Sequence, residues 1–109
     1  VSSPSGSTAY SLSAGGPVVA PTVDVLLITP LCPHSLQSCS FVVAGESKIC
    51  VKAKNNAANI SLALDGQDYV EIPSGGYVLI KKAGFTVNFL QTAKKNFYTV
   101  LREKRAEWK

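Results

Sequence analysis

Between residues 48 and 90 the chain alternates apolar and polar side chains in short runs separated by turn-forming residues. A period of two is typical of β-strands that bury one face, and it constrains the fold more than any other feature of this sequence. Asp65-Gly66 between two such runs predicts a tight hairpin turn. Because no strand–helix–strand rhythm accompanies the runs, we expect a mostly β, antiparallel, sandwich-like domain built as a meander. The predicted strands cover residues 48–54, 58–64, 69–72, 77–81 and 85–90.

The residues before this meander predict other elements. A short helix is expected over residues 7–14, because Gly15-Gly16-Pro17 follows and ends it. The nearly continuous apolar run over residues 23–29 predicts a strand that is covered on both faces. An irregular loop with two prolines is expected over residues 30–40.

A second helix is predicted at the end of the chain, over residues 97–107. Asn96 is a suitable N-cap, and apolar residues recur at spacings of three and four up to Trp108. Residues 93–109 also hold six of the Lys and Arg residues against two Glu, so the net charge of +4 is concentrated there. We expect a solvated helix face rather than a nucleic-acid site, because aromatic and basic residues do not interleave as in a stacking groove.

Composition limits the classes of protein to consider. The 109 residues fit one domain, and 46% apolar with 17% charged residues is typical of a globular protein. No apolar run reaches the roughly 18–20 residues that a membrane helix needs, so no membrane partner is expected. Cys32, Cys39 and Cys50 lack the spacing of a zinc site, and the single His34 is expected to be structural rather than catalytic. We therefore expect reduced thiols in the cytoplasm, with a Cys32–Cys39 bridge as the alternative.

The segment over residues 3–17 is the best candidate for chemistry. It is a loop of small residues that leads into a helix, where free N–H groups favour anions and polar ligand groups. Gly6 allows a close approach to the backbone, and Ser5, Ser7 and Thr8 supply hydroxyl groups. The Lys of a P-loop and the GxGxxG of a dinucleotide fingerprint are both missing from this segment. On these grounds nucleotide binding and a simple capped helix remain equally acceptable.

Ser-Pro-Ser-Gly-Ser-Thr-Ala-Tyr-Ser-Leu-Ser-Ala-Gly-Gly-Pro, residues 3–17, resembles the signature of the NAD kinase family almost residue for residue. Thr-Pro-Leu-Cys-Pro-His-Ser-Leu at residues 29–36, Asp-Gly-Gln at residues 65–67 and the closing helix are similar to later family motifs, in the same order. The similarity covers essentially the whole chain. It implies the C-terminal, NAD-binding domain of such an enzyme over residues 1–109, incomplete at its N-terminus.

The resemblance implies an enzyme that transfers a phosphoryl group from ATP, or polyphosphate, to the adenosine ribose 2′-hydroxyl of NAD and so makes NADP. It implies a divalent metal, commonly Mg²⁺, and a homodimer or homotetramer. Cys32 matches a position near nicotinamide that can belong to a neighbouring subunit's site. The residues that match NAD-binding positions of the family are Ser5, Thr8, Ala9, Tyr10, Ser11, Leu12, Ser13, Cys32 and Gln67.

The chain also departs from the family pattern. Cys39-Ser40 stands where the family usually has Arg-Pro, so a local ion pair or phosphate contact is in doubt. The family's Gly-Gly-Asp-Gly and Asn-Glu motifs precede the region that this chain matches. None of the seven acidic residues of this chain is placed to replace a general base. We therefore expect no catalytic residue and no metal ligand in this chain, and no activity from it alone.

Two alternatives to an NAD kinase remain. The first is a lipid kinase of the diacylglycerol and sphingoid-base group, which resembles NAD kinase in overall fold; the Ser-Thr-Ala-Tyr-Ser run argues against it. The second is a non-catalytic module whose β-strands oligomerise or dock a partner. Protection from thermal unfolding by NAD, and not by lipid, would favour an NAD kinase over a lipid kinase. Self-association in analytical ultracentrifugation, with no response to NAD, would favour the non-catalytic module.

Overall fold

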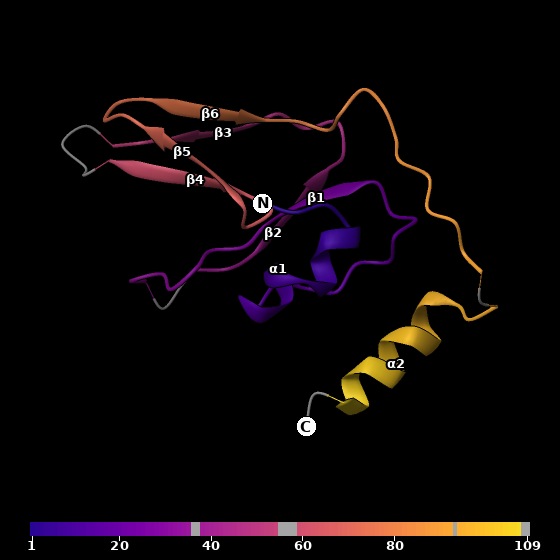
Figure 1. Cartoon of the computed structure of the whole chain (residues 1–109). Helices are drawn as coiled ribbons and strands as arrows, with labels where there is room; N and C mark the ends of the chain where they lie inside the picture. The colour runs from indigo at the N-terminus through magenta and orange to yellow at the C-terminus, as the bar shows by residue number, and fades with distance from the viewer. Residues whose placement is uncertain (36–37, 55–58, 93, 108–109) are drawn as a thin grey trace. The chain divides into compact units, whose positions relative to one another are not determined.

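The computed structural model describes residues 1–35, 38–54, 59–92 and 94–107 (Figure 1). The chain divides into two compact units. The first unit comprises Val1–Gly45 together with Ala83–Lys109, and the second comprises Glu46–Lys82.

The first unit begins with two short helical turns, the 3₁₀-helix η1 (Ser5–Thr8) and the α-helix α1 (Tyr10–Ser13). Strand β1 (Val25–Ile28) pairs antiparallel with β2 (Phe41–Ala44). On its other edge β1 is bonded to the start of the chain, because the N–H and C=O groups of Ser2 and Leu27 exchange two hydrogen bonds of 2.9 Å. Strand β1 therefore has partners on both edges.

Helix α2 (Phe97–Glu107) also belongs to the first unit. It begins where Asn96 Oδ1 accepts a 2.9 Å hydrogen bond from the Thr99 N–H, so the predicted cap and bounds of this helix are confirmed. Exposed Lys95 pairs with Glu103 at 2.8 Å. Within the described part of α2 no residue is buried. Trp108, the predicted end of the apolar stripe, lies outside the described residues.

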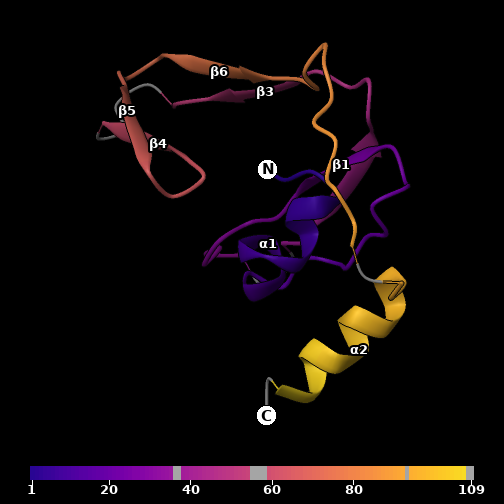
Figure 2. The ribbon, with the colours of Figure 1, turned by 45° about the vertical axis from the view of Figure 1, so that its right-hand side comes forward.

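The second unit consists of two antiparallel ribbons (Figure 2). One ribbon is a hairpin of β4 (Ile60–Leu64) and β5 (Asp68–Ile72), and Asp65 and Gly66 take positive φ values of 50° and 71° at its turn. Two successive residues at positive φ are characteristic of the type I′ turn that Asp-Gly favours. The other ribbon pairs β3 (Ile49–Lys52) with β6 (Tyr77–Ile80). In the sequence, the β4–β5 hairpin therefore lies between β3 and β6, the two strands that form the other ribbon.

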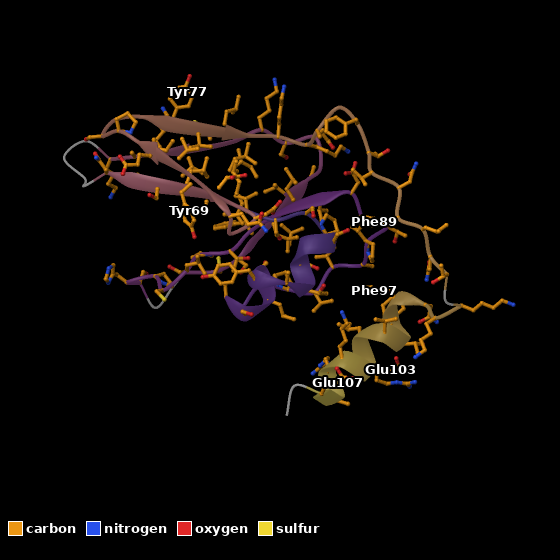
Figure 3. The ribbon with its side chains drawn as sticks, in the orientation of Figure 1. Tyr69, Tyr77, Phe89, Phe97, Glu103 and Glu107 are labelled. Carbon is orange, nitrogen blue, oxygen red and sulfur yellow. The ribbon has the colours of Figure 1, made fainter. Side chains whose placement is uncertain are left out.

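The buried apolar core is small in the part of the chain that the structure describes. It consists of Leu26 and Leu27 on β1 and Ala53 after β3, and Leu27 is fully buried. Many large side chains are exposed, among them Tyr69, Tyr77 and Phe89 (Figure 3). The best-packed part of the described chain is therefore β1 with its two neighbours, β2 and the segment around Ser2.

The predicted fold class is confirmed, because the chain consists mostly of antiparallel strands with a short helix near the start and one at the end. The strands predicted at residues 23–29, 48–54, 69–72 and 77–81 are present, with ends that differ by one or two residues. The strand predicted at 58–64 is present from Ile60, and its first predicted residue, Ala58, lies outside the described residues.

Four details of the prediction were wrong. Residues 85–90 form no strand, since they find no ladder partner among the described residues and stay exposed. The helix expected over 7–14 is two separate turns, because Ala9 leaves the helical region at φ −99° and ψ −128°. The meander order was wrong, since β3 pairs with β6 across an intervening hairpin. Strand β2 was not predicted, because its four apolar residues do not alternate.

Candidate functional site

The predicted ligand segment folds as two consecutive turns of backbone. Pro4, at φ −55°, starts η1, and its carbonyl accepts a 3.1 Å bond from the Ser7 N–H. The backbone leaves the helical region at Ala9 and enters α1, which ends at Ser13, and Gly15 follows two residues later at a φ of +89°. A positive φ is comfortable only for a residue without a Cβ, so Gly15 suits the end of a helix. The outcome is a compact double turn in which Ser7 and Ser11 are buried and the residues around them are partly or fully exposed.

One side of this double turn faces outward. Tyr10 has 70% of its surface exposed, and Ser5, Ala9 and Ser13 are exposed beside it. Thr8 and Leu12 are partly exposed. Six of the seven predicted NAD-binding residues in this segment are therefore accessible to a ligand. They offer hydroxyl groups, a small methyl surface and one aromatic face, which suits a nucleoside.

The other side of the double turn faces the protein through hydroxyl groups. Ser7 is fully buried, and its Oγ accepts a bond of 3.0 Å from the Val19 N–H and donates one of 3.3 Å to the Val19 carbonyl. Ser11 is almost fully buried, and its Oγ lies 3.1 Å from the Thr29 Oγ1. Buried hydroxyl groups that are bonded in this way hold a backbone in one geometry. Ser11, predicted to contact NAD, thus has its side chain engaged within the protein.

The same segment lines an open hollow of about 500 Å³ within the first unit. Pro4, Ser5 and Thr8 contribute from the double turn, and α2 contributes Phe97, Val100 and Lys104 among others. Ligand sites commonly have volumes of about 300–1,000 Å³, so the hollow is of suitable size for part of a dinucleotide.

The two remaining predicted site residues lie elsewhere. Cys32 is exposed in the loop after β1 and takes a positive φ of 41°. Gln67 is exposed after the β4–β5 turn, in the second unit, and its N–H donates to the Leu64 carbonyl at 3.0 Å. The structure therefore brings together only the seven predicted residues between Ser5 and Ser13. Among the residues that the structure describes, no group of three or more His, Cys, Asp or Glu could hold a metal ion.

Sequence reasoning missed the supports of this segment. Ser7 was considered only as a source of a hydroxyl, Val19 was not considered, and Thr29 was given no role beyond the predicted strand and the family motif that contain it. A sequence signal was available, because Ser7 and Ser11 are four residues apart and so recur at a helical spacing. Their partners lie 12 and 18 residues away, so only the tertiary structure reveals them.

Comparison with known proteins decides the family. The family described as ATP-NAD kinase C-terminal domain matches residues 1–92. The chain belongs to the NAD kinase family. It is 45% identical over 108 residues to an NAD kinase of Desulforamulus reducens, and 47% identical over 111 residues to one of Ruminiclostridium cellulolyticum. These alignments cover 99% and 100% of this chain but only 38% of each relative.

Among solved structures, the chain is similar to yeast NADH kinase in complex with NADH. The TM-score is 0.64 at 38% sequence identity, over 70% of this chain and 22% of the yeast chain. The described residues contain no helix of the length and apolarity that crossing a membrane requires.

Proposed function

We propose that this chain is the dinucleotide-holding part of a longer NAD kinase, which phosphorylates the adenosine ribose 2′-hydroxyl of NAD and so makes NADP. One observation carries the proposal. The family signature folds into a double turn whose outward side is accessible and whose inward hydroxyls are bonded to the protein. A preorganised backbone with an accessible polar face is what an adenosine ribose needs for a fixed position. The similarity to yeast NADH kinase with bound NADH supports the choice of ligand.

The outward residues have distinct proposed roles. Tyr10 and Thr8 contact the adenosine, with Ser5 beside them, because their exposed side chains offer a ring face and hydroxyl donors. Ala9 and Ser13 complete the same side of the segment. For Ser11 and Leu12 we propose backbone contacts, since the Ser11 hydroxyl is already bonded to Thr29. Cys32 and Gln67 are proposed to contact other parts of the dinucleotide, Cys32 near nicotinamide and across a subunit contact.

In the proposed reaction the ribose 2′-oxygen attacks the γ-phosphorus of ATP. The bond from that phosphorus to the β–γ bridging oxygen breaks, ADP leaves, and a general base takes the hydroxyl proton. The described residues of this chain do not fit a Mg²⁺ site made by the chain alone, because no three or more of their His, Cys, Asp or Glu side chains are grouped to hold a metal ion. We therefore place the base and the metal ligands in parts of the enzyme outside this chain, and assign to this chain only the holding of the nucleotide.

The setting of the enzyme is also proposed. Cys32, Cys39 and Cys50 are exposed free thiols, which fits the reducing conditions of the cytoplasm. Exposed apolar side chains on both ribbons of the second unit support assembly into a homodimer or homotetramer.

Activity of the full-length protein that contains this chain tests the proposal. We expect it to form NADP from NAD, ATP and Mg²⁺, and the 109-residue chain alone to form none. Tyr10→Ala should raise the KM for NAD by roughly tenfold through loss of stacking. Tyr69→Ala is the matched control, because Tyr69 lies in the second unit and is 68% exposed, and it should leave KM unchanged.

Two results would refute the proposal. One is a full-length protein that forms no NADP from NAD with either ATP or polyphosphate as the phosphoryl donor. The other is phosphorylation of diacylglycerol or a sphingoid base in place of NAD, which would assign the chain to the lipid kinases.

A further inference from the structure

Strand β1 and the residue that follows it hold the N-terminal region at two places, one just before the predicted ligand segment and one within it. Near the start, Ser2 and Leu27 exchange backbone hydrogen bonds of 2.9 Å, and Leu27 is fully buried. Near the end, the Ser11 hydroxyl lies 3.1 Å from the hydroxyl of Thr29, the residue that directly follows β1. The first hold is made by backbone groups, whereas the second depends on two side chains.

We propose that Thr29 is a positioning residue for the dinucleotide: through Ser11 it sets the orientation of α1, and so the affinity for NAD, without touching NAD. The inference rests on the proposed function. The motif over residues 29–36, which begins with Thr29 and Pro30, does not by itself predict this role. The motif is separate in sequence from the segment over residues 3–17 that contains Ser11.

The geometry of α1 makes its orientation sensitive to this pair. The helix has only four residues, Tyr10–Ser13, so its own hydrogen bonds cannot hold it rigidly. Ser11 points into the protein, whereas the neighbouring Tyr10 and the later Ser13 point outward. A rotation of α1 that followed loss of the Ser11–Thr29 bond would therefore move the proposed adenosine contacts directly.

Gly16, which follows α1, packs closely on the hydroxyl groups of Ser11 and Thr29. The Gly16 N–H donates a 2.8 Å bond to the Ser11 carbonyl. A Cβ added to Gly16 would lie 2.5 Å from the Ser11 Oγ and 2.7 Å from the Thr29 Oγ1. No side chain fits there, so the backbone of Gly16 packs directly against the two hydroxyl groups, whose hydrogen bond is part-buried. A hydrogen bond in such surroundings is stronger than one at the surface.

Substitution of Thr29 in the full-length enzyme tests the inference. Thr29→Val removes the hydroxyl at nearly constant shape and should raise the KM and the dissociation constant for NAD about five- to tenfold. The kcat and the KM for ATP should stay within about twofold. Thr29→Ser keeps a hydroxyl and should restore NAD affinity to near the wild-type value. Thr22→Val, an exposed Thr→Val change in the same unit, is the matched control and should have no effect.

A double-mutant cycle identifies the route of the effect. Ser11→Ala should weaken NAD binding as much as Thr29→Val does, and the double variant should be no worse than either single one. Should Thr29→Val fail to fold, Ser11→Ala and Thr29→Ser still provide the comparison. A merely structural pair would lower the midpoint of thermal unfolding and leave NAD affinity unchanged.

Three outcomes overturn the inference. Unchanged NAD affinity in Thr29→Val and Ser11→Ala, with an active wild type, refutes it alone. Additive effects in the double variant refute a route through Ser11. A wild-type protein that forms no NADP refutes the proposed function and this inference together.

Discussion

The two units of this chain bury their side chains in different ways. In the first unit a strand with partners on both edges carries the fully buried Leu27, and two buried serines bond to groups 12 and 18 residues away. In the second unit two ribbons pair through their backbones, and of the described residues only Ala53 is buried there. The first unit therefore fixes side-chain geometry, whereas the second fixes mainly backbone pairing.

This difference matches the roles proposed above, since most proposed NAD contacts lie in the first unit and the apolar surface proposed for assembly lies in the second. A nucleotide site needs groups held to a fraction of an ångström, which buried hydrogen bonds and a close-packed glycine provide. A two-stranded ribbon in water is only marginally stable and gains stability from a further surface. The exposed Val51, Val70 and Leu79 of the ribbons provide apolar surface for such packing.

Truncation of Leu27 should have the largest effect. Leu27→Ala opens a cavity beside β1 and should lower the free energy of unfolding of the full-length protein by about 3–4 kcal/mol. Leu79→Ala in β6 should cost less than about 1 kcal/mol, because that residue is 54% exposed. Urea denaturation measures both changes. Equal losses would show that the second unit is as well packed in the whole protein as the first, and the comparison would then fail.

Addition of a methyl group at Gly16 should have the second-largest effect on the free energy of unfolding. Gly16→Ala places its Cβ against Ser11 and Thr29, and overpacking of this kind should cost about 2–3 kcal/mol. The control is Gly84→Ala, where an added Cβ meets nothing within 4 Å, and its unfolding free energy should change by less than about 0.5 kcal/mol. NAD binding, measured by calorimetry, should weaken only in Gly16→Ala. Wild-type stability and binding in that variant would contradict the close packing around the hydroxyl pair.

Removal of a bonded hydroxyl should have a smaller effect. Ser7→Ala leaves the N–H and C=O groups of Val19 without their partner and should cost about 1–2 kcal/mol in unfolding free energy. Ser2 provides the control, since its buried Oγ finds no hydrogen-bond partner among the described residues. Ser2→Ala should therefore be neutral or slightly stabilising. If both variants lost the same unfolding free energy, burial of the serine side chains, rather than their hydrogen bonds, would be what stabilises the first unit.

The smallest effect is expected at the turn of the second unit. Gly66→Ala forces a residue with a Cβ to φ +71° and should cost about 1 kcal/mol. Asp65→Asn is the control, because asparagine tolerates positive φ, and it should be neutral. In a double variant the costs of Gly66→Ala and Gly16→Ala should add, as expected for independent sites in separate units. A clear departure from additivity in the denaturation curves would mean that the units are coupled.

Much of the local structure was predictable. The Asp65-Gly66 turn, the Asn96 cap and the bounds of α2 follow from short-range preferences and were confirmed. The strand predicted over 85–90 shows the limit of such reasoning. Its alternating pattern is real, but a strand needs a neighbour to bond to, and local sequence does not reveal whether one is available.

The candidate site stays a prediction, and only part of its geometry could be anticipated. The signature over residues 3–17 identified the segment, and the family assignment confirmed the resemblance on which that prediction stood. Its orientation was not predictable, because hydroxyl residues look alike in sequence whether they face a ligand or the protein. Ser11 and Ser13 are two residues apart in one four-residue helix, yet one is buried against Thr29 and the other is exposed.

By itself the sequence determined the Asp65-Gly66 turn, the cap and bounds of α2 and the segment that carries the family's hydroxyl groups, because these depend on residues close together in the chain. Only the tertiary structure decided that β3 pairs with β6 and that Ser7 and Ser11 turn inward to Val19 and Thr29. The physical reason is that such contacts join residues far apart in sequence, and their formation depends on the free energy of the whole fold rather than on local preference.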